Sequence, residues 1–133
     1  DRGAFQGSRA IELMASGTFV VEIVADGDWE LEITHPIPTE AIVRDLPLDV
    51  SGTGTQAIYF VKATPGLHTV TLTHDGRRPF NVSVMNSQAR QWDRIIQANG
   101  AFSGTAAISV RDEPFDYLIF DIRADGNWTM TID

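Results

Sequence analysis

The chain has 133 residues, a hydrophobic content of 43%, a formal net charge of −8 and no cysteine. Length and composition predict a single globular domain, residues 1–133, and exclude a disordered chain. The acidic balance argues against nucleic acid and anionic membranes as partners, and no stretch approaches the ~20 apolar residues of a membrane span. The lack of cysteine excludes disulfides and thiolate-bound metals.

A sequence pattern that occurs three times predicts duplicated units. The pattern is Gly-[Ser/Thr]-x-Ala-Ile-x-apolar, and an Asp-Gly pair follows each copy. The copies begin at Gly7, Gly54 and Gly104, and the pairs are Asp26-Gly27, Asp75-Gly76 and Asp125-Gly126. A repeat with a period of about 49 residues is typical of a duplicated structural unit. The units span about residues 3–35, 41–86 and 91–133.

Each unit contains runs in which apolar and polar residues alternate, and alternation at period two predicts half-buried strands. In chain order the runs are Ala10–Leu13, Phe19–Ala25, Trp29–Ile33, Ala41–Leu46, Ala57–Val61, His68–His74, Phe80–Met85, Gln91–Ile96, Ala107–Val110, Tyr117–Ala124 and Trp128–Ile132. An Asp-Gly pair between two such runs predicts a β-hairpin, because glycine and aspartate tolerate the positive φ of a tight turn. No window supports a long amphipathic helix.

The first unit lacks the strand that precedes the other two. Residues 1–7 align with residues 98–104, so this strand would have preceded Asp1. It was either lost or is supplied by another chain or domain. We therefore expect an open sheet edge that accepts a strand from a neighbouring domain or an identical subunit.

Eleven short runs separated by turns predict an all-β fold. We expect an antiparallel β-sandwich built from three units of about 49 residues. Three four-stranded units would also fit a β-trefoil or a β-prism, which is the alternative architecture.

Several short motifs follow one another in the second and third units. They are Ser51-Gly52-Thr53-Gly54, Pro65-Gly66-Leu67, His74-Asp75-Gly76, Phe80-x-Val82, Asn99-Gly100-Ala101-Phe102-Ser103-Gly104 and Ala124-Asp125-Gly126-Asn127-Trp128-Thr129-Met130-Thr131-Ile132. On these motifs, residues 50–133 resemble a repeated β-sandwich module of secreted or surface bacterial proteins, and residues 3–33 resemble its second half alone. The resemblance implies a non-catalytic appendage of a larger extracellular protein, and it carries no ligand or catalytic residue.

Trp92 is the strongest candidate for a ligand contact. The repeat gives Trp29 and Trp128 packing positions, whereas Trp92 has no such equivalent and lies between Arg90 and Arg94. An exposed tryptophan can stack on a sugar ring while polar neighbours bond its hydroxyls, so polysaccharide is the expected ligand. Tyr59 is a weaker companion. Alternatively, Trp92 closes the edge of the sandwich.

Histidines, acidic turns and threonines have structural interpretations that we favour over functional ones. His68 and His74 share a strand face but lie about 20 Å apart at strand rise, too far for one zinc ion. The Asp-Gly turns resemble fragments of calcium loops, yet no glutamate follows at the required spacing. Thr69, Thr71 and Thr73 share a face that the other units do not continue, which predicts solvent-facing threonine. We expect no metal and no cofactor.

No nucleophile motif such as Gly-x-Ser-x-Gly and no phosphate-binding loop occurs, so an enzyme is not expected. The leading hypothesis is a non-catalytic extracellular or cell-surface module with a structural, assembly or adhesion role in a larger protein or fibre. The alternative is a carbohydrate-binding module that uses an exposed tryptophan.

Overall fold

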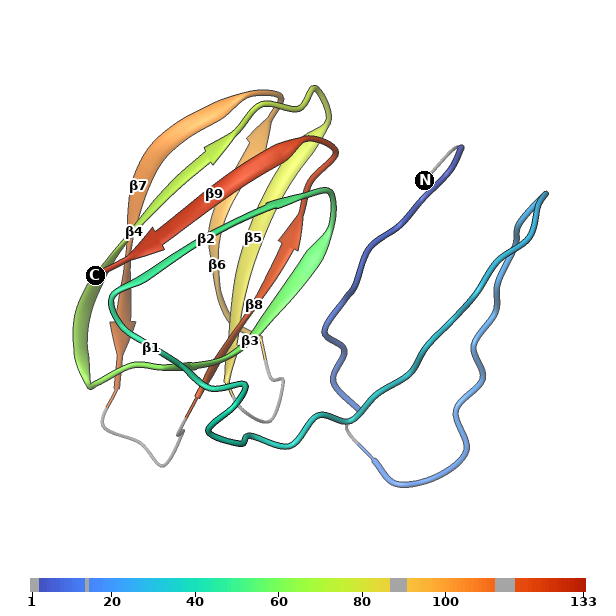
Figure 1. Cartoon of the computed structure of the whole chain (residues 1–133), viewed down its shortest axis with the longest axis horizontal. Helices are drawn as coiled ribbons and strands as arrows, with labels where there is room; N and C mark the ends of the chain where they lie inside the picture. Colours follow the sequence, from blue (N-terminus) through green and yellow to red (C-terminus); the bar gives the residue numbers. More distant parts are fainter. Residues whose placement is uncertain (1–2, 14, 87–90, 112–116) are drawn as a thin grey trace.

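The computed structural model describes residues 3–13, 15–86, 91–111 and 117–133, and the backbone alone of Gln91 and Trp92. Every regular element in these ranges is a strand, and the strands form two sheets packed face to face (Figure 1). The predicted β-sandwich is therefore confirmed. Within the described ranges, no helix is long and apolar enough to cross a membrane.

The strands fall into a five-stranded and a four-stranded sheet. The five-stranded sheet has the order β1 (Arg44–Asp45), β3 (Gln56–Lys62), β8 (Leu118–Arg123), β5 (Pro79–Asn86) and β6 (Gln91–Asn99). The four-stranded sheet has the order β2 (Leu48–Thr53), β9 (Asn127–Ile132), β4 (Gly66–His74) and β7 (Phe102–Val110). Of the predicted runs in the second and third units, Ala41–Leu46 was wrong in position. Only Arg44–Asp45 of it is strand, and the long strand follows at Leu48–Thr53.

The two sheets are built by interleaving the second and third units. Every antiparallel ladder of the described structure joins a strand of residues 41–86 to a strand of residues 91–133. Only the short parallel pair of β1 with β3 lies within one unit. Neither unit can therefore form its antiparallel ladders without the other.

An approximate two-fold symmetry relates the two units. Strands β2, β3, β4 and β5 of one unit correspond to β6, β7, β8 and β9 of the other. Exchanging each strand with its counterpart converts the order β3-β8-β5-β6 of the five-stranded sheet into β7-β4-β9-β2, which is the order of the four-stranded sheet read in reverse. The central ladders agree in register: Ser83 pairs with Asp121, and the residues that match them in the repeat, Thr131 and Thr71, pair with each other. The structure thus shows two equivalent units in the sandwich and not the three that the repeat predicted.

The Asp-Gly turns do not close hairpins, which corrects the prediction. The turn at Asp75-Gly76 connects β4 to β5, and the turn at Asp125-Gly126 connects β8 to β9. In both cases the two strands belong to different sheets. The residue pattern identifies a tight connection correctly, but it cannot show that each strand pairs with the other unit.

The core lies between the two inner faces and follows from the alternation along the strands. Its largest fully buried side chains are Trp128, Phe80, Phe120, Leu72, Ile122, Met130 and Ile132. All buried members of the core cluster lie between Leu48 and Ile132. The sandwich therefore obtains its buried apolar area without any residue of the first unit.

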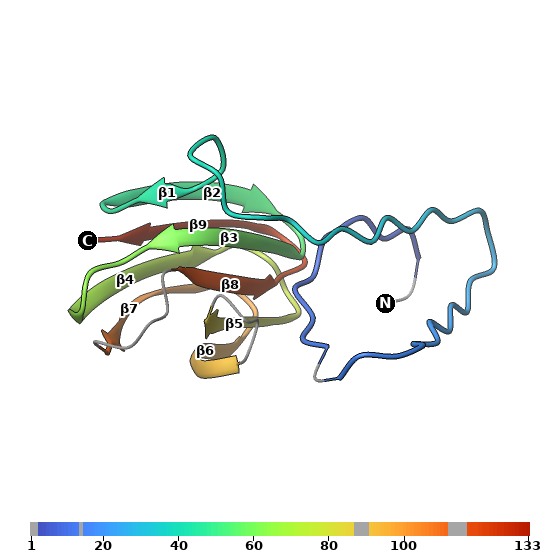
Figure 2. The same cartoon turned by 90° about the horizontal axis from the view of Figure 1, so that it is seen from below.

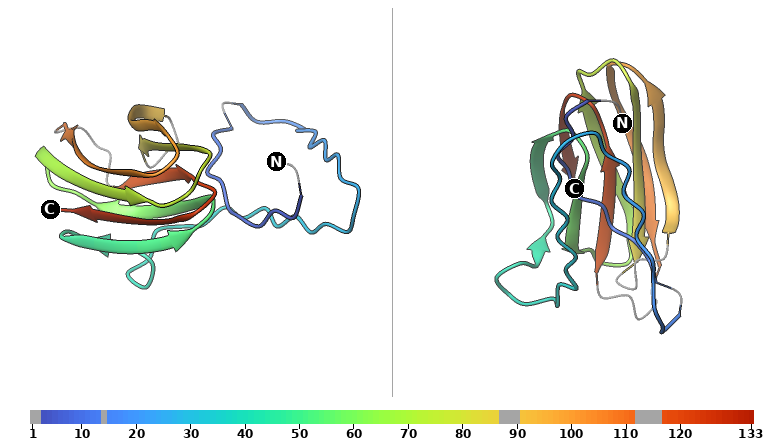
Figure 3. Two further views of the ribbon diagram at one scale, coloured as in Figure 1. Left: turned by 90° about the horizontal axis from the view of Figure 1, so that it is seen from above. Right: turned by 90° about the vertical axis from the view of Figure 1, so that its right-hand side faces the viewer.

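Residues 3–40, which we name the arm, lie outside the sandwich. Figures 1 and 2 and the left panel of Figure 3 show the arm extending away from one end of the two sheets. No strand occurs among its described residues, so the three strands predicted at Ala10–Leu13, Phe19–Ala25 and Trp29–Ile33 are wrong for this chain. The reason is the interleaving: a unit finds its strand partners only in a second unit.

Candidate functional site

The arm exposes the apolar residues that the equivalent unit buries. Trp29 is 61% exposed while its repeat equivalent Trp128 is 1% exposed, and Ile33 is 68% exposed while Ile132 is fully buried. The exposed large apolar residues of the arm are Phe5, Ile11, Leu13, Phe19, Val20, Val21, Ile23, Val24, Trp29, Leu31, Ile33 and Ile37. Soluble monomers rarely leave so much apolar surface in water on one segment, so the arm is the candidate functional site.

The arm contacts the sandwich next to the turn between β2 and β3. The backbone N–H of Ser8 donates to the carbonyl of Thr55 over 3.0 Å, and the N–H of Ala57 donates to Ser8 Oγ over 3.1 Å. A side chain at position 7 would collide with the Thr55 carbonyl, so only glycine permits this approach.

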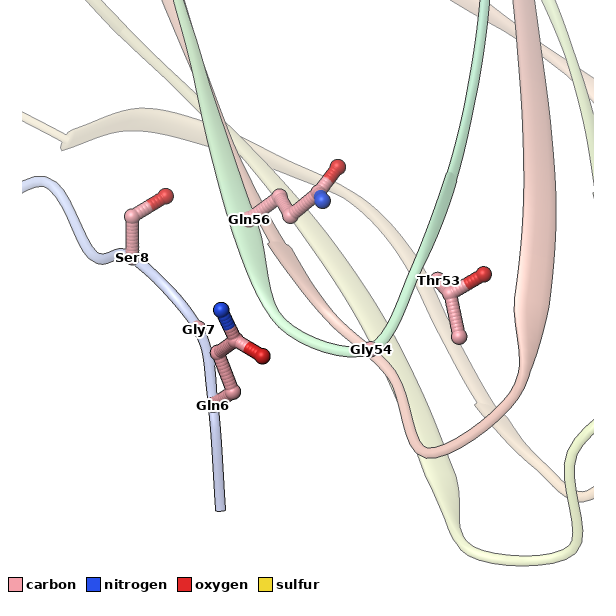
Figure 4. Close-up of a pocket in the computed structure, with 6 residues that line it drawn as sticks. All are labelled: Gln6, Gly7, Ser8, Thr53, Gly54 and Gln56. Atoms are coloured by element: carbon pink, nitrogen blue, oxygen red, sulfur yellow. The ribbon is translucent and has the colours of Figure 1, made fainter.

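A hollow of about 560 Å³ lies at this contact. Figure 4 shows the side chains that line it, on the arm and on the β2–β3 turn. The lining residues are Gln6, Gly7, Ser8, Thr53, Gly54 and Gln56, of which the two glycines contribute backbone atoms alone. The lining combines amide and hydroxyl groups with apolar surface, and the hollow lies between the arm and the sandwich.

An ion pair fixes the arm to the outer face of the five-stranded sheet. Arg9 Nε lies 2.9 Å from Asp121 Oδ1 and 3.1 Å from Asp121 Oδ2. Asp121 is only 3% exposed, and Arg123 Nε is its second cationic neighbour at 3.6 Å. A buried carboxylate is costly without such partners, and the arm supplies one of the two cations beside Asp121, while Arg123 of the sandwich supplies the other.

A cluster of hydrogen bonds joins the two Asp-Gly turns at the same end of the sandwich. Asp75 accepts from the backbone N–H and the side-chain amide of Asn127, over 2.6 and 2.8 Å. Asp125 Oδ2 accepts from the N–H groups of Arg77 and Arg78, and Asp125 Oδ1 lies 3.3 Å from His74 Nε2. Three of the four carboxylate oxygens thus accept hydrogen bonds from protein N–H groups, and the fourth, Asp125 Oδ1, lies beside the buried His74 Nε2, which forms no hydrogen bond within the described residues.

These contacts shift both carboxyl groups in the same direction. The side-chain and backbone N–H groups of Asn127 hold the pKa of Asp75 below its usual value of 3.8. Burial acts to raise the pKa of Asp125, but the N–H groups of Arg77 and Arg78 outweigh it and lower this pKa as well. Both turns are therefore stabilised by the ionised carboxylates.

The lowered pKa values predict a loss of stability in acid. A carboxyl whose pKa is lower in the folded state stabilises the fold above its unfolded pKa, and this contribution disappears as the pH falls through the folded pKa. We expect Asp75→Asn to lower the urea midpoint at pH 7. The difference from the wild type should shrink as the pH falls below about 3.8 towards 2. A difference that stays constant down to pH 2 would contradict the role of the ionised carboxylate.

The two candidate histidines have separate structural environments. His74 is buried, stacks on Phe80 at a ring separation of 4.5 Å, and lies with Nδ1 2.9 Å from the Gly100 carbonyl. His68 lies with its ring nitrogens 2.9 and 2.8 Å from the backbone oxygens of Asp133 and Thr64. No group of three or more histidine, aspartate and glutamate side chains that could hold a metal occurs in the described ranges.

The predicted carbohydrate contacts are not brought together where the structure describes them. Tyr59 lies exposed on β3, next to a bulge at which Phe60 adopts a φ of 59°. Arg94 lies on β6, and β8 and β5 separate β6 from β3, which amounts to about 14 Å at the usual strand spacing. Arg90 and the side chain of Trp92 lie outside the described residues, so a ligand contact at Trp92 stays a prediction.

Arg94 instead borders a second polar hollow, of about 180 Å³, on the outer face of the five-stranded sheet. Its Nη1 donates to Gln97 Oε1 over 3.0 Å. The lining residues are Asn81, Ser83, Arg94, Gln97, Asp121 and Arg123. The hollow therefore adjoins the carboxylate to which the arm is fixed.

The threonine face is broader than the sequence suggested. Thr71 pairs with Thr131 and Thr105, and Thr73 pairs with Thr129 and Ser103, so hydroxyls continue across three strands of the four-stranded sheet. The sequence indicated a narrow face because the positions equivalent to Thr69, Thr71 and Thr73 in the other units are not threonine. The strands that flank β4 are β7 and β9, which are not its equivalents in the repeat.

Sequence reasoning missed the ion pair between Arg9 and Asp121, which lie 112 positions apart. The repeat aligns Arg9 with Ala106, so no counterpart of this arginine signals a role. Asp121 carries a weak signal, because it is the single charged residue in the apolar run Leu118–Ile122.

Comparison with known proteins gives a distant structural likeness. No protein-family model matches the chain, and no curated protein matches it. A crystal structure of the pre-peptidase C-terminal domain of a collagenase from Bacillus anthracis is similar at 9% sequence identity, with a TM-score of 0.49. The match covers 74% of this chain and 100% of that domain.

Proposed function

We propose that the chain is a non-catalytic extracellular β-sandwich module with a structural role in a larger surface protein or fibre. In this proposal the sandwich is the folded body, and the arm attaches it to a neighbouring polypeptide. The observation that carries the proposal is the exposed apolar series of the arm, whose equivalents in the sandwich are buried.

Two further features support an attachment role. The arm is held at its base by Arg9 and Ser8, so its distal part leaves the sandwich from a fixed position. The apolar residues from Phe19 to Ile33 are separated by acidic residues at Glu22, Glu30 and Glu32. Within the described ranges, residues 19–33 form no hydrogen bond between backbone groups. Such a segment is suited to β-strand addition, in which a partner supplies the missing ladder.

The molar mass in solution tests this proposal. We expect light scattering after size-exclusion chromatography to show a mass that rises with concentration for the full chain, because without its partner the exposed apolar side chains of the arm associate loosely and form no defined ladder. A variant without residues 1–40 should remain monomeric and folded, since the core cluster and the side chains packed against it lie between Leu46 and Ile132.

A double substitution tests whether the apolar side chains of the arm, and not the length of the chain, cause the rise in mass. Trp29→Asp combined with Leu31→Asp changes only side chains that are exposed, so it should leave the sandwich intact and abolish the rise in mass. If the full chain stays monomeric at every concentration and behaves as both variants do, self-association through the arm is excluded.

A further inference from the structure

Antiparallel strand pairing in this sandwich occurs between units and not within them. The arm carries the runs that match β7, β8 and β9, so the arm needs strands from another unit before it can form any antiparallel ladder. We propose that the arm is one half of a second sandwich, completed by a neighbouring polypeptide segment with the strand pattern of residues 41–99. This inference rests on the proposed attachment role and names the partner.

The match between the arm and the third unit extends to individual core positions. In the sandwich the third unit buries Ile108, Val110, Leu118, Phe120, Ile122, Trp128, Met130 and Ile132. The repeat places Ile11, Leu13, Phe19, Val21, Ile23, Trp29, Leu31 and Ile33 at these positions. Every one of them is apolar and exposed in the arm. The arm therefore has apolar equivalents of the inner-face residues of β7, β8 and β9.

A second copy of the arm is a poor occupant for electrostatic reasons. The repeat matches Glu22 to Asp121 on β8 and Glu32 to Thr131 on β9. Because the two-fold related ladders share one register, pairing two arms would place Glu22 of each opposite Glu32 of the other. Like charges directly opposite on neighbouring strands are destabilising.

A partner with the pattern of residues 41–99 avoids this repulsion. In the sandwich, the residue opposite Asp121 on β5 is Ser83, and the residue opposite Thr131 on β4 is Thr71. Such a partner therefore presents a neutral hydroxyl to each of Glu22 and Glu32. It also brings a strand equivalent to β6, for which the arm has no counterpart.

The folded sandwich of a second copy is not the occupant either. Its residues 41–86 already pair with residues 91–133, and β5 forms a long ladder with β6 from Pro79 to Met85. The arm has three runs and no equivalent of β6, so displacing the third unit would sacrifice this ladder. The partner segment must therefore lack a bound third unit.

A fusion protein tests the proposal directly. A copy of residues 41–99 is joined to Gly3 of the full chain, which preserves the junction because Gly3-Ala4-Phe5 matches Gly100-Ala101-Phe102. We expect hydrogen exchange of the amides in residues 19–33 to slow at least about 100-fold relative to the unfused chain. The rise in mass with concentration should disappear in the fusion, because the arm is then buried.

The matched control carries Phe80→Asp and Val82→Asp in the added copy only, since both positions are fully buried in the sandwich. It should leave the arm unprotected, while slow exchange in the original β4, β5 and β8 shows that the first sandwich remains folded. Equal exchange of the arm in fusion and control would overturn the proposal. A defined dimer of the unfused chain with protected arms would overturn it in favour of a second copy.

These outcomes separate the two claims. Arm-dependent association of the unfused chain together with an unprotected arm in the fusion rejects the partner segment and retains attachment. Absence of both association and protection rejects the partner segment and the attachment role together.

Discussion

Replacing Trp128 by alanine should lower the free energy of unfolding by about 3–5 kcal/mol, the range for removing a large buried aromatic side chain. Trp128 is 1% exposed, and its Nε1 donates to the Gly54 carbonyl over 2.9 Å. Its ring lies against Gly52, where an added Cβ would collide with it. The substitution therefore removes a hydrogen bond as well as packing across both sheets.

The repeat provides a matched control for this substitution. Trp29 occupies the equivalent position in the arm and is exposed, so Trp29→Ala should change the free energy of unfolding by less than about 0.5 kcal/mol. Urea unfolding of both variants, followed by far-ultraviolet circular dichroism, measures the difference. Similar losses in the two variants would show that the arm packs in the monomer, contrary to its exposure.

Gly126→Ala should lower the free energy of unfolding by about 2–3 kcal/mol, because the added methyl group is forced into a packed turn. A Cβ at this position would lie 2.5 Å from the backbone nitrogen of Gly76 and 2.7 Å from its Cα. It would also collide with the Asp75 carboxylate that bonds Asn127. Backbone atoms on both sides prevent a cheap adjustment.

The equivalent change in the arm has no such obstacle. Nothing lies within 4 Å of a Cβ built on Gly27, so Gly27→Ala should change the free energy of unfolding by less than about 0.5 kcal/mol. Thermal unfolding of the two variants at one pH provides the comparison. If Gly126→Ala were as mild as Gly27→Ala, the close contact between the two turns would not exist in solution.

The strands of the second and third units could be predicted because their alternation reflects one buried face. Trp128–Ile132 and His68–His74 lie within one or two residues of β9 and β4. The same alternation predicted strands in the arm, and none occurs among its described residues. Alternation reports which face a strand would bury, and it contains no information on whether a partner is present.

Sheet partners could not be predicted, since local turn chemistry does not specify them. Asp125-Gly126 would give a tight connection in a hairpin as well as between two sheets. In this fold β8 and β9 belong to different sheets, because each of them pairs with strands of the second unit. The ion pair between Arg9 of the arm and Asp121 could not be predicted from the sequence either. Arg9 is one of 10 basic residues, and only the fold brings it to Asp121.

The interleaving of the units has a consequence for the order of events during synthesis. When the ribosome has released residues 41–86, none of their antiparallel ladders can form, because every partner strand lies between residues 91 and 133. The nascent unit must keep its apolar face in water until the second half emerges, and contacts of such sequence separation form slowly. The arm resembles such a nascent unit, because its apolar residues are exposed and its described residues form no strand ladder with a second unit.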